Sequence, residues 1–172
     1  MIRALRYVPV LIFGSGVTAF LFNLLLGAGI WKPDFELPLV DIQQVKCAGD
    51  RIHVSLGYYS RIQTYDQEGR MIEKLQVDNF SKPFSFRLDG SGKPTIQVRG
   101  IVPTNERPVT HVEGWTYFVQ APCGVSISQP LIWQLLGGPI RPWLLAGAGL
   151  LFALVLFPGA FAKLVSGPKA PR

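Results

Sequence analysis

Two long apolar segments without charged residues lie near the two ends of the chain. The first covers residues 8–30 and the second covers residues 142–162. At 1.5 Å per helical residue each would extend over about 30–35 Å, which is enough to cross a hydrocarbon core of about 30 Å. The pattern therefore predicts two transmembrane helices.

The first apolar segment also has features of a secretory signal peptide. Arg3 and Arg6 precede it, and the small residues of "GAGI" (27–30) close it. Signal peptides usually have an apolar core of about 7–15 residues, which is shorter than this segment. We expect a retained helix, and cleavage near residue 30 is the alternative.

Between the apolar segments, hydrophobic and polar residues alternate over short stretches. This period of two appears in residues 50–57 and continues through a hairpin pattern at 60–77, whose turn "DQEG" carries turn-forming residues. A second hairpin is predicted at 82–100, and residues 109–120 supply at least one more strand. We expect six or seven short antiparallel strands, each with one apolar face.

These elements predict a membrane α+β fold, with two transmembrane helices flanking a small extracytoplasmic antiparallel β-domain. A short helix near Trp133 would lie at the outer membrane surface; the alternative is a longer second span kinked at Pro139. Trp31 and Trp143 would mark the outer ends of the spans. The expected order is a cytoplasmic tail (1–7), a transmembrane helix (8–30), the β-domain (31–128), an interfacial segment (129–141), a transmembrane helix (142–162) and a cytoplasmic tail (163–172).

The distribution of charge predicts how the chain is oriented. All 11 acidic residues lie between the apolar segments, whereas five of the 17 basic residues lie in the two terminal tails. Basic tails favour the cytoplasmic side, so we expect a multi-pass protein of the plasma (inner) membrane with both termini in the cytoplasm. The formal charge of +6 thus gives no support to nucleic-acid binding. The expected partners are the lipid bilayer and other membrane-protein subunits.

The two cysteines lie near the two ends of the predicted β-domain. An extracytoplasmic compartment would allow Cys47 and Cys123 to form a disulfide. Two separate buried thiols are the alternative. Two isolated cysteines and two isolated histidines lack the ligand spacing of a zinc site, so we expect no metal or cofactor.

Candidate catalytic groups are sparse. His53 alternates with apolar strand positions and is expected to face solvent, and His111 has no nucleophile or carboxylate at motif spacing. Asp34 and Glu36 are expected to be solvated residues of a linker between prolines. We predict no catalytic, cofactor-binding or metal-binding residue.

Small residues recur at regular spacing in both apolar segments. Such residues allow helices to approach closely, and an intramembrane asparagine would seek a hydrogen-bond partner. A packing face is expected, although glycine is also common in membrane helices generally. The predicted helix-packing residues are Ser15, Ala19, Asn23 and Gly27 in the first segment and Ala146, Gly149 and Ala153 in the second.

Residues 51–77 resemble a single blade of an NHL-type β-propeller. The resemblance is carried by Arg61, Ile62, Gln63, Tyr65, Asp66 and Gly69, which match an "RIQ-hydrophobic-YD-x-x-G" strand and turn. It implies a blade-like antiparallel sheet. A closed propeller needs about four blades or more, for which the predicted domain has no room.

The sequence favours a non-catalytic membrane protein, an accessory or scaffolding subunit of a membrane complex. The alternative is a membrane module that binds a ligand, peptide or glycan. A solvent-facing aromatic cluster among Tyr58, Tyr59, Tyr65 and Trp115 would favour that alternative. A pocket joining His53 or His111 to a carboxylate would favour an enzyme instead.

Overall fold

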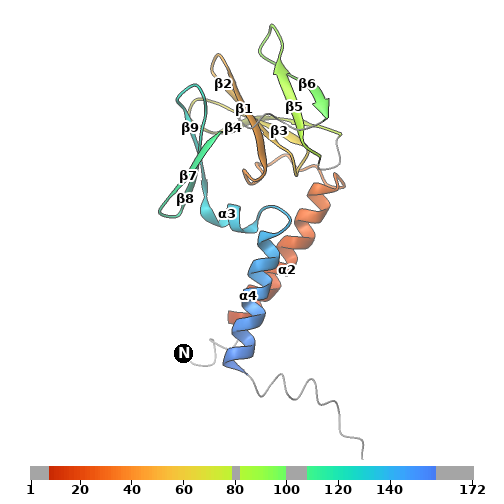
Figure 1. The fold of residues 1–172 in the computed structure, drawn as a ribbon, viewed down its shortest axis with the longest axis vertical. Coiled ribbons are helices and arrows are strands. Elements are labelled where there is room, and N and C mark those ends of the chain that lie inside the picture. The colour runs from red at the N-terminus through yellow and green to blue at the C-terminus, as the bar shows by residue number, and fades with distance from the viewer. Residues whose placement is uncertain (1–7, 79–81, 100–107, 158–172) are drawn as a thin grey trace, which may run out of the picture.

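The computed structural model describes residues 8–78, 82–99 and 108–157, and these residues form an α+β fold (Figure 1). Two long helices pack along each other beneath three antiparallel sheets. The predicted α+β class, the apolar N-terminal helix and the antiparallel sheets are thereby confirmed. The strands together, residues 42–130, are called the β-region below.

Nine strands are present in the described residues, and they form three sheets. The first sheet has the order β1-β2-β3-β4, the second pairs β5 with β6, and the third has the order β7-β8-β9. The strands are β1 (Ile42–Ala48), β2 (Arg51–Leu56), β3 (Arg61–Tyr65), β4 (Met71–Gln76), β5 (Phe84–Leu88), β6 (Pro94–Arg99), β7 (Val109–Glu113), β8 (Thr116–Gln120) and β9 (Ser126–Pro130).

The prediction of six or seven strands with one apolar face each was wrong. β1 contains two glutamines, and β9 contains two serines and a glutamine; neither has a clear apolar alternation, so sequence periodicity did not identify them. In β3 all five residues are buried, and in β2 only the first residue is exposed. Both faces of these central strands are covered, which a period-two pattern does not anticipate.

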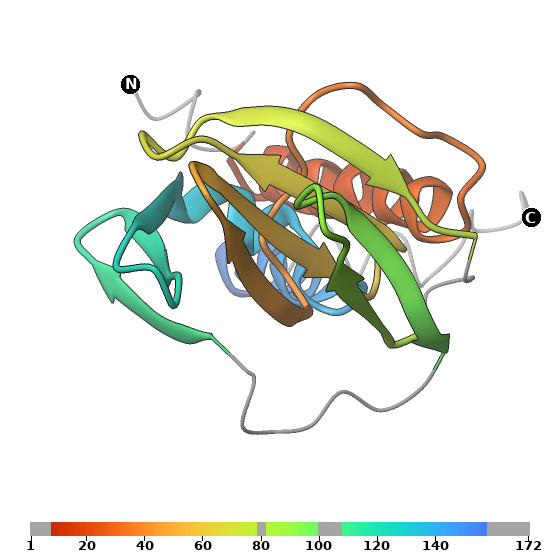
Figure 2. The same ribbon diagram turned by 90° about the horizontal axis from the view of Figure 1, so that it is seen from above.

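The two faces of the first sheet meet different parts of the chain. Ile52, Val54 and Leu56 belong to a core shared with the linker of residues 31–41 and with the third sheet. The opposite face packs against the β5–β6 hairpin, through a second core that includes Ile62 and Phe86. Seen from above, the β5–β6 hairpin and the third sheet lie on either side of β1 and β2 (Figure 2).

The helices are α2 (Val8–Gly27), α3 (Leu131–Leu136) and α4 (Arg141–Leu156). Of the described helices, α2 alone is long and apolar enough to cross a membrane, whereas α4 is a shorter apolar helix of 16 residues. The predicted second span continues to residue 162, and residues 158–162 lie outside the described part of the chain.

Close contact between α2 and α4 depends on glycine. A Cβ atom at Gly16 would lie 2.5 Å from the backbone nitrogen of Ala146, and one at Gly149 would lie 2.6 Å from that of Phe13. Neither position could hold a larger residue unless the helices moved apart. Phe20 and Trp143 pack beside this contact, with ring centroids 4.7 Å apart.

Candidate functional site

A buried polar cluster joins α2 to the β-region. We call it the junction and define it as Asn23, Tyr59, Leu136 and Gly138. The Asn23 side chain donates from Nδ2 to the Leu136 carbonyl at 2.7 Å, and its Oδ1 accepts from the Tyr59 hydroxyl at 2.6 Å and the Gly138 amide at 3.0 Å. A second Nδ2 bond, to Ala19 O at 2.7 Å, completes the two donors and two lone pairs of this amide.

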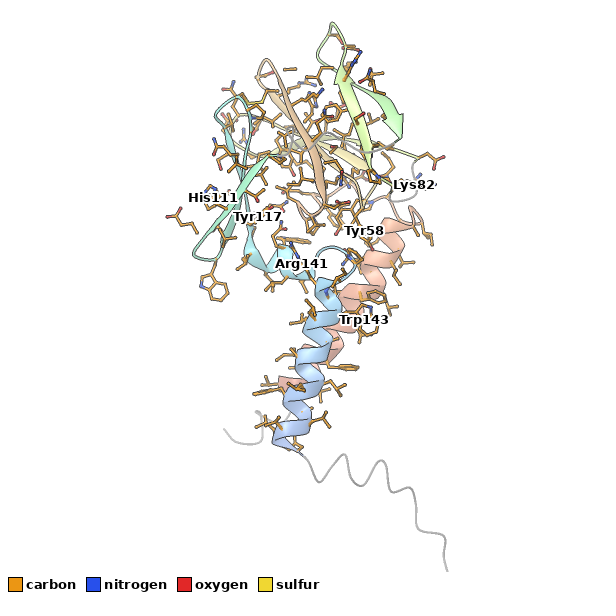
Figure 3. All side chains as sticks on the ribbon, in the orientation of Figure 1. Tyr58, Lys82, His111, Tyr117, Arg141 and Trp143 are labelled. Atoms are coloured by element: carbon orange, nitrogen blue, oxygen red, sulfur yellow. A yellow bond between two sulfur atoms is a disulfide. The ribbon has the colours of Figure 1, made fainter. Side chains whose placement is uncertain are left out.

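The corner between β2 and β3 places Tyr58 and Tyr59 beside the end of α2. Ser60 adopts a left-handed conformation with φ of 48°, which helps this short corner to reverse direction. Tyr58 donates to the Asn23 carbonyl at 3.0 Å, and its ring lies where a Cβ on Gly27 would be. Figure 3 shows Tyr58 between the β-region and the upper end of α2. Burial raises the pKa of Tyr59 well above its ordinary value, so its hydroxyl stays a neutral donor.

Side chains from β3 and β9 fix the linker of residues 31–41 by binding its backbone. Gln63 accepts from the Leu37 amide at 2.7 Å and donates to the Leu37 carbonyl at 3.1 Å. Gln129 accepts from the Leu39 amide at 2.8 Å. Arg61 donates to the carbonyls of residues 33 and 35 at 3.0 and 2.9 Å. The linker is therefore hydrogen-bonded along much of its length instead of being a free tether.

Glu36 is half-buried, so the prediction that it is a solvated linker residue was wrong. Its Oε1 accepts from the Tyr65 hydroxyl at 2.9 Å and from the Gln129 side-chain amide. These donors come from strands about 30 and 90 residues away along the chain, so the linker sequence alone could not reveal them. Asp34 does face solvent and forms an ion pair with Lys74.

The prediction that His53 faces solvent was also wrong. Its side chain is only 1% exposed, and Nδ1 lies 2.9 Å from the Thr64 hydroxyl on the neighbouring strand. The β5–β6 hairpin covers this face, and the resulting burial lowers the pKa of His53. His111 lies on the exposed strand β7, where its ring stacks on Phe118.

A polar pocket of about 560 Å³ lies between the β1–β2 turn and the β5–β6 turn. His53 contributes to its wall together with Asp50 and Glu73, so this pocket has the combination of histidine and carboxylate that would favour an enzyme. His53 is only 1% exposed, however, so its ring presents almost no surface to a molecule in the pocket. Glu73 is exposed and paired with Arg51 at 3.4 Å.

The predicted disulfide is present between Cys47 and Cys123, whose Cα atoms lie 6.2 Å apart. It connects the first sheet to the loop before β9. Over the described residues, no group of three or more His, Cys, Asp or Glu side chains could hold a metal ion.

The seven predicted helix-packing residues have different surroundings. Ala146 and Gly149 are buried against α2, and Ala153 is half-buried. On α2, Asn23 belongs to the junction and Gly27 lies under Tyr58. Sequence spacing did not single out Gly16, which lies directly against the backbone of α4 at Ala146. Ser15 is exposed and Ala19 half-buried, and both line an apolar groove on another side of α2.

Two cavities adjoin α3, one beside α2 and one between the linker of residues 31–41 and the end of β9. The groove beside α2 has a volume of about 480 Å³, and a smaller cavity of about 350 Å³ includes Glu36 in its wall. Trp133 contributes to both. Tyr59 and Tyr65 are buried and Trp115 is 83% exposed, so these side chains do not form one exposed aromatic cluster.

Comparison with protein-family models, curated proteins and solved structures gives no match to this chain.

Proposed function

We propose that this chain is a non-catalytic integral membrane protein that acts as an accessory or scaffolding subunit of a membrane complex. It holds the β-region in a fixed orientation outside the membrane. The junction is the observation that carries the proposal. Asn23 on α2 forms hydrogen bonds both to the β2–β3 corner and to the segment between α3 and α4, so the helices and the β-region share one hydrogen-bonded centre.

A fixed orientation suits a scaffold, because partner subunits that contact the helices and the β-region then find these two surfaces in one relative arrangement. The linker adds to this restraint, since Gln63 and Gln129 bind its backbone. Ordering these groups costs conformational entropy, and their many buried hydrogen bonds offset that cost. A mere membrane tether would need neither feature.

The proposed membrane placement rests on the helices and the charges. Large apolar side chains on α2 and α4 are exposed, among them Leu21, Leu25, Leu144 and Leu151. Trp31 follows α2 and Trp143 lies in the first turn of α4, where a membrane interface would favour tryptophan. With the basic terminal tails, this supports a multi-pass protein of the plasma (inner) membrane with cytoplasmic termini.

Gentle-detergent purification of a tagged copy from its native membrane would test the proposal. We expect recovery in a large assembly of defined stoichiometry, measured by particle mass and composition. An Asn23→Leu variant should remain in the membrane fraction yet retain less of its partners, because the β-region is no longer fixed. Recovery of the wild-type chain as a monomer or homodimer would refute the scaffolding role.

A ligand-binding membrane module is the second candidate, favoured by the polar pocket near His53. Arg51, Glu73 and Lys93 line it, so it offers both positive and negative charge to a small polar ligand. Saturable binding of such a ligand by the monomeric chain, lost in a Lys93→Ala variant, would support this candidate over the scaffold.

A further inference from the structure

We propose that the two cavities beside α3 together form a binding site for one membrane lipid with a positively charged amine head. The lipid chain would occupy the groove beside α2, and the amine would approach Glu36. The inference rests on the membrane placement proposed above and deepens it by assigning a lipid class to one surface.

The groove beside α2 is suited to an acyl chain. Its walls are mainly apolar, with Leu11, Phe22 and Leu26 from α2 and Leu136 from α3. Small residues reduce the bulk of the helix here, and a Cβ atom on Gly14 would have no neighbour within 4 Å. An apolar hollow of about 480 Å³ at the surface of a membrane helix would be filled by lipid or by another apolar group.

The smaller cavity is suited to a cation. Glu36 lies in its wall with the aromatic side chains Phe35 and Trp133, which are 42% and 39% exposed. A carboxylate attracts an ammonium group directly, and aromatic faces add cation–π attraction. Both hydrogen bonds to Glu36 end on Oε1, and within the described part of the chain Oε2 receives none.

No neighbouring charged side chain in the described residues forms a salt bridge with Glu36, so its carboxylate is available to a bound cation. Arg61 interacts with it electrostatically, but the Arg61 guanidinium donates to backbone carbonyls, and the salt bridges among the described residues do not include Glu36. Lys74 pairs with Asp34 instead. Glu36 is thus a half-buried acid that no described cation pairs with directly.

Trp133 is the reason for joining the two cavities into one site. It forms part of the wall of both, so the two cavities adjoin at this side chain, and the proposed lipid would lie across it with its head in one cavity and its tail in the other. A free amine would use only the smaller cavity. The shape and charge therefore favour an amphiphile, such as a phosphatidylethanolamine, over a soluble amine.

Native mass spectrometry of the full chain in mild detergent would test this site. The probe is an equimolar mixture of phosphatidylethanolamine and phosphatidylglycerol with identical acyl chains. We expect the wild-type chain to retain the ethanolamine lipid about tenfold better, equivalent to about 1.4 kcal/mol. Glu36→Gln should bind the two lipids equally, because Gln keeps an oxygen for Tyr65 and Gln129 but has no charge.

Asp34→Asn is the matched control, since it removes a negative charge two residues away that faces solvent. It should keep the preference of the wild-type chain. Equal retention of both lipids by the wild-type chain, or an unchanged preference in Glu36→Gln, would overturn the inference. So would the same loss in Asp34→Asn, or displacement of the lipid by free ethanolamine at equal concentration.

Carbonate washing of membranes separates this inference from the proposed function. A chain released by carbonate would refute the membrane placement itself. A chain that resists carbonate and shows no lipid preference would refute only the lipid site.

Discussion

Replacing Asn23 by Leu is expected to be among the most damaging single changes in α2. Leu has the branched shape of Asn, so the change removes the polar atoms and leaves no cavity, although its methyl groups are larger than the amide oxygen and nitrogen. Asn23 is only 3% exposed, and its side-chain amide makes four hydrogen bonds. The effect should therefore come from buried partners that lose their bonds, and crowding by the larger Leu side chain would add to it.

Counting those partners gives the expected magnitude. The Ala19 carbonyl keeps its bond within α2, and the Gly138 amide keeps the Tyr59 oxygen at 3.1 Å. The Leu136 carbonyl and the Tyr59 hydroxyl hydrogen lose their Asn23 partner. At about 1–3 kcal/mol for each unsatisfied buried group, Asn23→Leu should lower the free energy of unfolding by about 3 kcal/mol.

Tyr59→Phe should cost less, about 1 kcal/mol, because it leaves no group of the junction without a partner. The Gly138 amide still reaches Asn23 Oδ1 at 3.0 Å. In the double variant the Tyr59 hydroxyl is absent, but the Gly138 amide loses both of its oxygen partners, so two buried groups are again unsatisfied, as in Asn23→Leu alone. The combined cost should therefore stay at about 3 kcal/mol, which is about 1 kcal/mol short of the sum. Denaturant unfolding of the full chain in detergent, followed by near-UV circular dichroism with the disulfide intact, measures all four proteins.

Two results would refute this reasoning. One is a loss below about 1 kcal/mol in Asn23→Leu, which would mean that solvent satisfies the junction. The other is strict additivity in the double variant, which would mean that Asn23 and Tyr59 act independently.

Three further predictions concern pH, covalent linkage and helix packing. His53 has a lowered pKa in the folded state, so the unfolded chain binds a proton at this residue first as the pH falls. Stability should therefore decrease as the pH drops below about 6.5, which unfolding midpoints at pH 7 and 5 would measure. The decrease should be absent in His53→Gln and still present in His111→Gln. Reducing the disulfide, which spans 76 residues of sequence, should lower the free energy of unfolding by roughly 4 kcal/mol, measured by denaturant titration with and without reductant. Gly16→Ala should destabilise the protein by about 1–3 kcal/mol, because the added Cβ meets the backbone of Ala146. Gly147→Ala should have little effect, because a Cβ there has no neighbour within 4 Å. Equal unfolding midpoints for the two variants would contradict the close approach of α2 and α4 at Gly16.

Local patterns carried the prediction of the individual elements. The charge-free run at residues 8–30 predicted the helix α2, and alternation predicted the hairpins β3–β4 and β5–β6 with their turns. Both signals depend on residues close together in sequence, so they can be recognised without any knowledge of tertiary packing. The compartment argument and the positions of the two cysteines were also sufficient to predict their disulfide.

Burial of polar residues could not be predicted in the same way. His53 and Glu36 resemble solvent-facing residues in sequence, yet the β5–β6 hairpin and the Gln129 side chain cover them from far along the chain. Asn23 was singled out from its helical spacing, but its partners Tyr59 and Gly138 were not, because no local pattern records which loop reaches a helix end.

By itself, then, the sequence determined the apolar helix, the antiparallel hairpins and the cysteine pair, because each follows from periodicity, charge or composition over a short range. Only the tertiary structure decided that the strands divide into three sheets, that Gly16 instead of Ser15 meets α4, and that Glu36 lines a cavity. These features arise from contacts between distant segments, where the satisfaction of buried polar groups and the fit of side chains select one arrangement.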